Sequence, residues 1–129
     1  MSDKFKVEII TPDKSILESE ASEVTIPSYE GQMGILKDHI PLITFLRPGI
    51  IIIQEKEEKK YYVEEGTVEF SNNTLLILTS TAKDLNDLNQ SLIKDLMYQA
   101  ENKFKDDSSS DKEKYLLSYK INTLKEISQ

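Results

Sequence analysis

The sequence predicts a mainly β domain followed by a helical hairpin. Before Thr81, short apolar segments alternate with turn residues, a pattern typical of a β-sandwich or barrel of roughly nine or ten strands. At about Thr81 the apolar residues begin to recur at steps of three and four, which indicates helix. No proline or glycine occurs after Gly66. We therefore expect a β-sandwich domain at 1–83 and an antiparallel two-helix hairpin at 84–129.

Alternation of apolar and polar residues predicts the individual strands. Phe5–Ile10 alternates in this way, Thr11-Pro12-Asp13 predicts a turn, and Ile16–Ile26 continues as strand with a break near Glu20. Asn72-Asn73 can adopt the positive φ angles of a two-residue hairpin turn. Further strands are expected at 33–36, 42–46, 50–54, 61–64, 67–70 and 75–79.

The segment Ile26–Ile53 concentrates the turn residues of the chain. It holds three of the four prolines, three of the four glycines, the only histidine and the only arginine. Such a density of turn residues within apolar sequence predicts a tightly built corner of a β-structure. We expect a loop at 27–32 and a type II turn at Pro48-Gly49. The apolar residues expected in the core or on an interaction surface beside it are Ile35, Ile43, Phe45 and Ile50–Ile53.

Two helices are expected, over about 86–105 and 111–127. The first carries one apolar stripe, formed by Leu85, Leu88, Leu92, Leu96, Ala100 and Phe104. The polar sequence Asp106–Asp111 separates the helices, and Ser110 and Glu113 have the spacing of a capping box at a helix start. Because two helices alone bury only one seam, the hairpin is expected to pack on the sandwich or on a partner.

Composition excludes several classes of function. The net charge is −7, and acidic residues outnumber basic ones on both sides of Lys83. This balance argues against binding of nucleic acid or of an anionic membrane surface. The absence of cysteine excludes disulfides and thiolate metal sites. Apolar runs such as Ile50–Ile53 are too short to span a bilayer, and charges at the N-terminus argue against a signal peptide. We expect a soluble, cytoplasmic chain that is monomeric when isolated.

No catalytic constellation is evident in the sequence. His39 is the only histidine, which leaves neither a histidine pair for zinc nor a Ser-His-Asp arrangement. We expect it to be a turn residue that bonds its neighbours. Glu55, Glu57 and Glu58 fit the solvated tip of a hairpin.

Other possible ligand sites are equally weak. Glu64 and Glu65 alternate across a strand, so their carboxyl groups point to opposite faces. The acidic sequence at 106–111 lacks the glycine and the terminal glutamate of a calcium loop. The glycines follow no phosphate-binding order. The residues therefore favour a binding or coupling protein without catalytic, cofactor or metal site.

Three segments carry a resemblance to a known family. EGQMGILKDHIPLITFLRPG (30–49) is similar to a long, specific run in the epsilon subunit of the rotary, proton-translocating F-type ATP synthase of bacterial type. VEEGTVEF (63–70) and LLILTSTAKDL (75–85) resemble two further segments of that family, although Glu65 stands where a glycine is usual. The resemblance covers nearly the whole chain.

The resemblance implies a ten-stranded sandwich that belongs to the rotor stalk and is not catalytic. Such a subunit binds the gamma subunit and the c-ring, and it helps proton-driven rotation reach the catalytic head. It is a peripheral protein on the cytoplasmic face of the bacterial inner membrane. The residues implied nearest the c-ring are Tyr29, Glu30, Gly31, Gln32 and Met33, and those at a gamma-facing corner are His39, Pro41 and Leu42. Gln32 replaces an acidic residue that is frequent in the family, which argues against a salt bridge there.

The resemblance also concerns the hairpin. In relatives it contacts the alpha/beta head transiently and inhibits ATP hydrolysis, and in some bacterial members it binds ATP. The residues that stand at the ATP motif include Leu88, Asn89, Leu92 and Ile93, and both the aspartate and the arginine of that motif are missing. Because an arginine is hard to replace in forked phosphate contacts, we predict no ATP binding.

Three functions can be compared at this stage. The first is the rotor-stalk coupling subunit, with weak or absent inhibition of hydrolysis because the hairpin mixes its charges. The second is an ATP-sensing regulatory module acting through the hairpin. The third, a small sandwich enzyme, lacks the paired histidines, cysteines or carboxylates that it would need.

Overall fold

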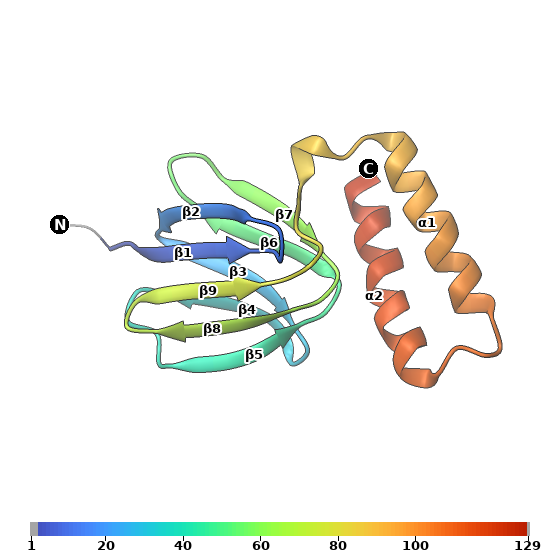
Figure 1. Cartoon of the computed structure of the whole chain (residues 1–129), viewed down its shortest axis with the longest axis horizontal. Coiled ribbons are helices and arrows are strands. Elements are labelled where there is room, and N and C mark those ends of the chain that lie inside the picture. The colour runs from blue at the N-terminus through green and yellow to red at the C-terminus, as the bar shows by residue number, and fades with distance from the viewer. Residues whose placement is uncertain (1–2, 129) are drawn as a thin grey trace.

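The computed structural model describes residues 3–128, which form a curled ten-stranded sheet and two helices (Figure 1). This confirms the predicted sandwich and helical hairpin. The strands are β1 (Phe5–Ile10), β2 (Ser15–Ala21), β3 (Glu23–Ser28), β4 (Gly31–Leu36), β5 (Leu42–Leu46), β6 (Gly49–Gln54), β7 (Lys59–Val63), β8 (Gly66–Ser71), β9 (Thr74–Leu78) and β10 (Lys83–Asp84). The helices are the 3₁₀ turn η1 (Leu85–Asp87), α1 (Gln90–Lys105) and α2 (Asp111–Ser128).

The sheet runs in the order β10-β7-β6-β3-β5-β8-β9-β1-β2, and β4 pairs with the other side of β3. All pairings are antiparallel except that of β1 with β9. One residue pair, Ser28 with Leu46, joins β3 to β5. The sheet passes at this point from the layer of β3, β4, β6, β7 and β10 to the layer of β5, β8, β9, β1 and β2.

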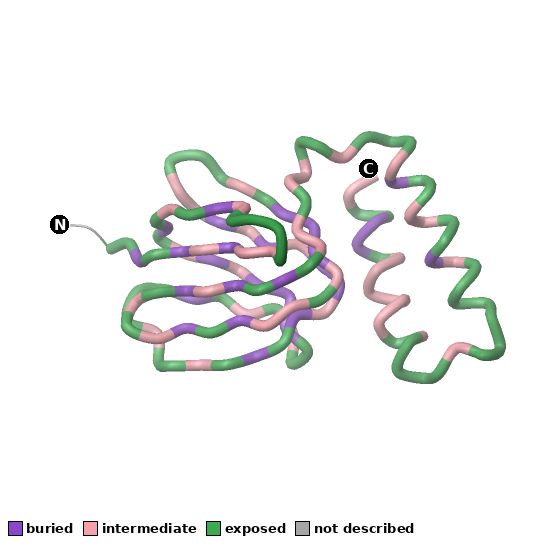
Figure 2. The backbone as a smooth tube through the Cα atoms, viewed as in Figure 1, coloured by how far each residue is buried: buried purple, intermediate pink, exposed green. Residues whose placement is uncertain are grey.

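Alternation along the strands explains the core between the layers. In β1 the side chains of Phe5, Val7 and Ile9 are buried while Lys6 is exposed, as the period of two requires. Buried positions, in purple, recur along the strands between exposed and half-buried ones (Figure 2). Each fully buried aliphatic or aromatic side chain contributes about 1.5–3 kcal/mol, so the sandwich core supplies most of the folding energy.

Local sequence signals predict several turns and caps correctly. Asn72 and Asn73 have φ angles of 51° and 54° and form the hairpin turn between β8 and β9. At the start of α2 the Glu113 N–H donates to Ser110 Oγ at 3.1 Å, and the Ser110 N–H donates to Glu113 Oε1 at 3.4 Å. This is the predicted capping box.

The expected loop at 27–32 is wrong, because strand pairing extends into it. Pro27 pairs with Gln32 and Ser28 with Gly31, which leaves only Tyr29 and Glu30 in the turn. The buried Ser28 hydroxyl organises this tight turn. It donates to the Gly31 carbonyl at 2.7 Å and accepts from the Glu30 N–H at 3.2 Å.

The expected type II turn at Pro48-Gly49 is also wrong. That turn needs a positive φ at its second central residue, and among the described glycines only Gly31 and Gly66 have one. Gly49 instead begins β6 and lies against Pro27. A Cβ at position 49 would be 2.5 Å from the Pro27 Cβ, so the position needs glycine for space.

The first helix begins later than the expected residue 86. The Asp84 carboxylate accepts from the Asn86 N–H at 2.9 Å and stabilises η1, and the Asn89 side chain accepts from the Leu92 N–H at 2.8 Å. Asp84 therefore caps the start of η1, and Asn89 caps the start of α1. The chain turns between them, and α1 begins at Gln90.

We predict that Gly66→Ala destabilises the protein by about 2–4 kcal/mol, measured by urea unfolding. Alanine is strained at the positive φ of this position, and its Cβ would also collide with a neighbouring strand. Gly66 has φ of 156°, and a Cβ there would lie 2.7 Å from the Leu78 carbonyl oxygen. Gly31→Ala is the matched control, since its φ of 124° is also positive but its Cβ would meet nothing within 4 Å. Equal losses for the two variants would contradict the packing argument.

Candidate functional site

The functional candidates are surfaces, and three can be built from the residues: a turn, a corner and an exposed sheet face. The turn is formed by Tyr29 and Glu30. Tyr29 is 40% exposed, and its N–H donates to the Phe45 carbonyl at 3.1 Å. Next to it, the Arg47 N–H donates to the Pro27 carbonyl at 3.0 Å. These bonds fix the β3–β4 turn to the end of β5. Gly31, Gln32 and Met33 lie in β4 and not in a loop.

The corner lies at the opposite end of β5, where His39, Pro41 and Leu42 lead into the strand. His39 Nδ1 is 2.7 Å from the Ile40 carbonyl oxygen, and its ring packs edge-on against Phe70 with centroids 5.9 Å apart. This confirms the expectation that His39 bonds its neighbours in a turn. Leu42 packs against the sandwich core.

A reciprocal pair of side-chain bonds holds the corner in place. The Asp38 N–H donates to Asn73 Oδ1 at 2.7 Å, and Asn73 Nδ2 donates to Asp38 Oδ1 at 2.9 Å. Asp38 has a φ of 66°. The β4–β5 turn is therefore tied to the β8–β9 turn. Sequence reasoning missed this link, because 35 positions separate the two residues.

The exposed sheet face consists of apolar side chains on the outer side of the second layer. Register places Phe45, Leu78 and Ile10 in one row, with Thr67 between the first two. In the next row Glu69 separates Ile43 from Leu76. We call Ile10, Ile43, Phe45, Leu76 and Leu78 the outer apolar face. Ile43 is 71% and Phe45 59% exposed, so this layer is apolar on both sides.

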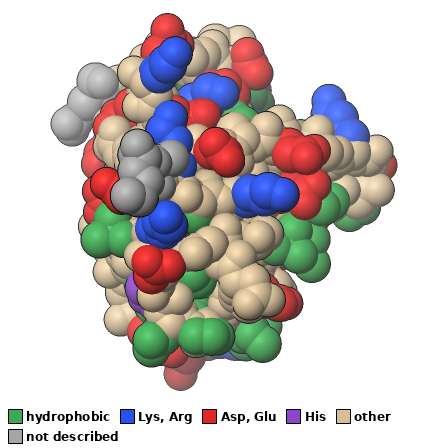
Figure 3. All heavy atoms as spheres, turned by 90° about the vertical axis from the view of Figure 1, so that its left-hand side faces the viewer, with side chains coloured by type: hydrophobic (Ala, Val, Ile, Leu, Met, Phe, Trp, Pro, Cys, Tyr) green, Lys and Arg blue, Asp and Glu red, His purple; other side chains and the backbone are tan. Residues whose placement is uncertain are grey.

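The end of the sandwich opposite the helices is more polar. Figure 3 views the end of the sandwich opposite the helices, where acidic and basic side chains intermingle and hydrophobic ones gather mainly at the lower edge. Ile40, next to the corner, is 74% exposed. Several large apolar side chains exposed close together, as on the outer apolar face, are typical of a protein–protein contact.

The hairpin meets the sandwich at Tyr62, which is buried with Ile93 and Leu124. Burial and the neighbouring Glu64 carboxylate raise the pKa of the Tyr62 hydroxyl. The hydroxyl donates to Glu64 Oε2 at 2.9 Å, and Lys120 Nζ from α2 lies 3.0 Å from the same oxygen. Sequence reasoning gave no signal for this contact.

The four positions at the ATP motif have packing and capping roles. Leu88 packs in the cluster around Tyr62, Asn89 caps α1, Leu92 is half-buried and Ile93 is 3% exposed. The prediction that the chain binds no ATP stays a prediction. Within residues 3–128, no three histidine, cysteine, aspartate or glutamate side chains are grouped as metal ligands.

A sandwich with exposed apolar strands and a packed helical hairpin defines a protein that acts through its surfaces. Comparison with known proteins agrees. Residues 4–84 match the family described as ATP synthase, delta/epsilon chain, β-sandwich domain. The chain is 50% identical to the ATP synthase epsilon chain of Pelagibacter ubique (strain HTCC1062), covering 97% of this chain and 98% of that one. It is 34% identical to the chloroplastic ATP synthase epsilon chain of Pyropia yezoensis, covering 91% and 87%.

The chain therefore belongs to the ATP synthase epsilon chain family, and the prediction of a non-catalytic ATP synthase subunit is confirmed. Solved structures share the fold. A chain of the Euglena gracilis mitochondrial ATP synthase matches with a TM-score of 0.75 at 19% identity, covering 97% of this chain and 79% of that one. A chain of the Tetrahymena thermophila mitochondrial ATP synthase central stalk and c-ring matches with 0.71 at 18%, covering 96% of both. None of the helices within 3–128 is long and apolar enough to cross a membrane.

We predict that Asn73→Gly destabilises the protein by about 1 kcal/mol more than Asn72→Gly, in urea unfolding. Both residues have positive φ, so glycine fits each backbone and raises the entropy of the unfolded chain equally. Only Asn73 bonds Asp38. Equal losses would mean that the link to Asp38 contributes nothing to the corner.

Proposed function

We propose that the chain is a rotor-stalk subunit that couples rotation of the c-ring to ATP synthesis in the catalytic head. In this role it binds the gamma subunit and the c-ring and is peripheral on the cytoplasmic face of a bacterial inner membrane. Membership of the epsilon chain family supports the proposal. The Tetrahymena chain of similar fold belongs to a structure of an ATP synthase central stalk and c-ring.

The outer apolar face is the proposed binding surface for the gamma subunit. A monomer gains nothing from exposing Ile43 and Phe45 side by side on a sheet, whereas a partner that covers them gains the energy of their burial. The face begins next to the corner of His39, Pro41 and Leu42. Gamma therefore covers the corner and the outer apolar face together.

The Tyr29–Glu30 turn is the proposed contact with the c-ring. It is a short exposed projection with one aromatic ring and one carboxylate, and its shape is fixed by the Ser28 hydroxyl. Such a turn suits contact with polar loops. Gln32 is exposed on the outer side of β4 beside the turn. Because its amide is uncharged, we propose that it contacts the c-ring through hydrogen bonds and not through a salt bridge.

For the gamma surface, we predict that Ile43→Thr and Phe45→Thr each weaken binding of gamma at least tenfold, because each removes a large apolar side chain from the interface. Threonine keeps the strand propensity, and the exposed positions leave stability within about 0.5 kcal/mol of the unchanged chain. Surface plasmon resonance with immobilised gamma measures the affinity. Tyr98→Thr, on α1 and 70% exposed, is the control. An equal loss with Tyr98→Thr, or none with the other two, contradicts this surface.

For the hairpin, the proposal is weak or absent inhibition of ATP hydrolysis. Its seven lysines are intermixed with nine acidic residues from Asp84 onward, and Lys120 already pairs with Glu64. No concentrated basic face is left for an acidic partner. Deleting 85–129 should leave the hydrolysis rate of the assembled enzyme within about twofold. A several-fold rise on deletion contradicts the proposal.

A further inference from the structure

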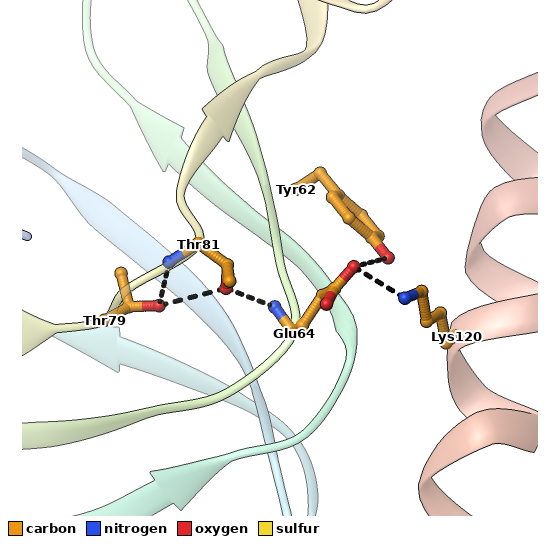
Figure 4. Close-up of polar contacts among 5 residues, drawn as sticks. All are labelled: Tyr62, Glu64, Thr79, Thr81 and Lys120. Atoms are coloured by element: carbon orange, nitrogen blue, oxygen red, sulfur yellow. Dashed lines mark hydrogen bonds and ion pairs between the residues drawn. The ribbon is translucent and has the colours of Figure 1, made fainter. Parts of the chain in front are cut away.

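Glu64 lies at the junction of the sandwich, of α2 and of residues 79–82 between β9 and β10, which we call the linker (Figure 4). Its Oε2 accepts the Tyr62 hydroxyl at 2.9 Å and lies 3.0 Å from Lys120 Nζ. The Glu64 side chain is 27% exposed and that of Lys120 17%. The lysine of this ion pair is therefore more protected from solvent than those of the pairs Lys59–Glu55 and Lys60–Glu58, which are more than 40% exposed.

The backbone of Glu64 is bonded to the linker that leads to the hairpin. The Glu64 N–H donates to Thr81 Oγ1 at 3.0 Å, and the Thr81 N–H donates to Thr79 Oγ1 at 3.2 Å. Thr79 Oγ1 in turn donates to the Glu65 carbonyl. Glu64 thus contacts α2 through its side chain and bonds the start of the linker through its backbone N–H, while its carboxylate also accepts from the Tyr62 hydroxyl.

Arg47 makes a second polar contact with the same part of α2. Its guanidinium carbon lies 3.8 Å from the centre of the Tyr119 ring, within the range of a cation–π interaction. Tyr119 and Lys120 are adjacent on the helix. The sandwich therefore contacts two adjacent residues in the middle of α2. Arg47 lies over Tyr119, and Glu64 pairs with Lys120.

The apolar part of this junction is small. Among the described residues, Tyr62 is the only strand side chain in the cluster that it forms with Ile93 and Leu124. The remaining members come from η1, its C-cap and the helices: Leu85, Leu88, Leu96, Met97 and Ile127. Because this apolar cluster is small, the polar contacts contribute a substantial part of the free energy that holds the hairpin on the sandwich.

We propose that Glu64 is an electrostatic latch that holds the hairpin on the sandwich through Lys120, so that salt weakens the docking. Removing either partner leaves the other charge half-buried and unpaired. Added salt screens the pair, in part because it is not fully buried. The latch needs no partner subunit, so it goes beyond the coupling function, and either proposal can fail without the other.

Native-state hydrogen exchange on the full chain tests the latch, because it reports even a small population of opened hairpin. In Glu64→Gln and in Lys120→Met, α2 amides near Leu124 should exchange about fivefold faster at low salt. Amides of β6 at Ile51–Ile53 should be unchanged. In the unchanged chain, 0.5 M NaCl should speed exchange in α2, and each variant should lose most of this response.

Two comparisons make the result decisive. Lys125→Met removes an exposed lysine of α2 and should leave exchange near Leu124 and its response to salt as in the unchanged chain. The double variant Glu64→Gln/Lys120→Met should exchange no faster than the faster single variant, since both remove one interaction. The proposal is overturned if Glu64→Gln leaves α2 as it was, if β6 accelerates equally, if Lys125→Met has the same effect, or if the single effects add.

Discussion

The close contact between Gly49 and Pro27 fixes the point at which the sheet changes layer, and the exposed surfaces depend on it. Space for a Cβ is missing at Gly49, so the start of β6 lies directly against β3. The Arg47 N–H is then in reach of the Pro27 carbonyl, and Ser28 pairs with Leu46. Pro27 lies where the ladder on this side of β3 is interrupted, because β3 pairs with β6 only as far as Thr25 and with β5 only at Ser28. Its carbonyl accepts the bond from Arg47.

This bend makes β5 the element that links the two proposed interfaces. Its five residues run from the His39 corner to the Tyr29–Glu30 turn, a length of about 17 Å at the usual rise per residue. Thr44 and Leu46 are buried on its inner side, while Ile43 and Phe45 face outward. A strand that is packed on its inner side and hydrogen-bonded along its length transmits force between its ends with little deformation. The geometry is therefore consistent with the proposal that interfaces lie at both ends of β5.

Sequence predicted what depends on neighbouring residues and missed what depends on contacts between distant ones. Alternation located the strands, and the step to helical spacing located the hairpin. The turn at Asn72-Asn73 and the capping box at Ser110 were predicted because their chemistry is local. The loop at 27–32 and the turn at Pro48-Gly49 were wrong because β3, β4 and β6 pair or pack there across the sheet. The apolar residues Ile43 and Phe45 were identified, but only register placed them outside.

The same distinction separates the two parts of the molecule energetically. The sandwich has a continuous core of buried side chains from all of its long strands. The hairpin has a seam of its own, and it contacts the sandwich through the buried Tyr62 ring, the Glu64–Lys120 ion pair, the Arg47–Tyr119 cation–π contact and the packing of α2 on β6. Contacts of these kinds contribute a few kcal/mol together, and part of that depends on salt. The docking of the hairpin is therefore expected to be more sensitive to salt than the core of the sandwich. Glu64, whose backbone N–H is bonded to the linker and whose carboxylate faces α2, lies at the contact between the sandwich and the hairpin.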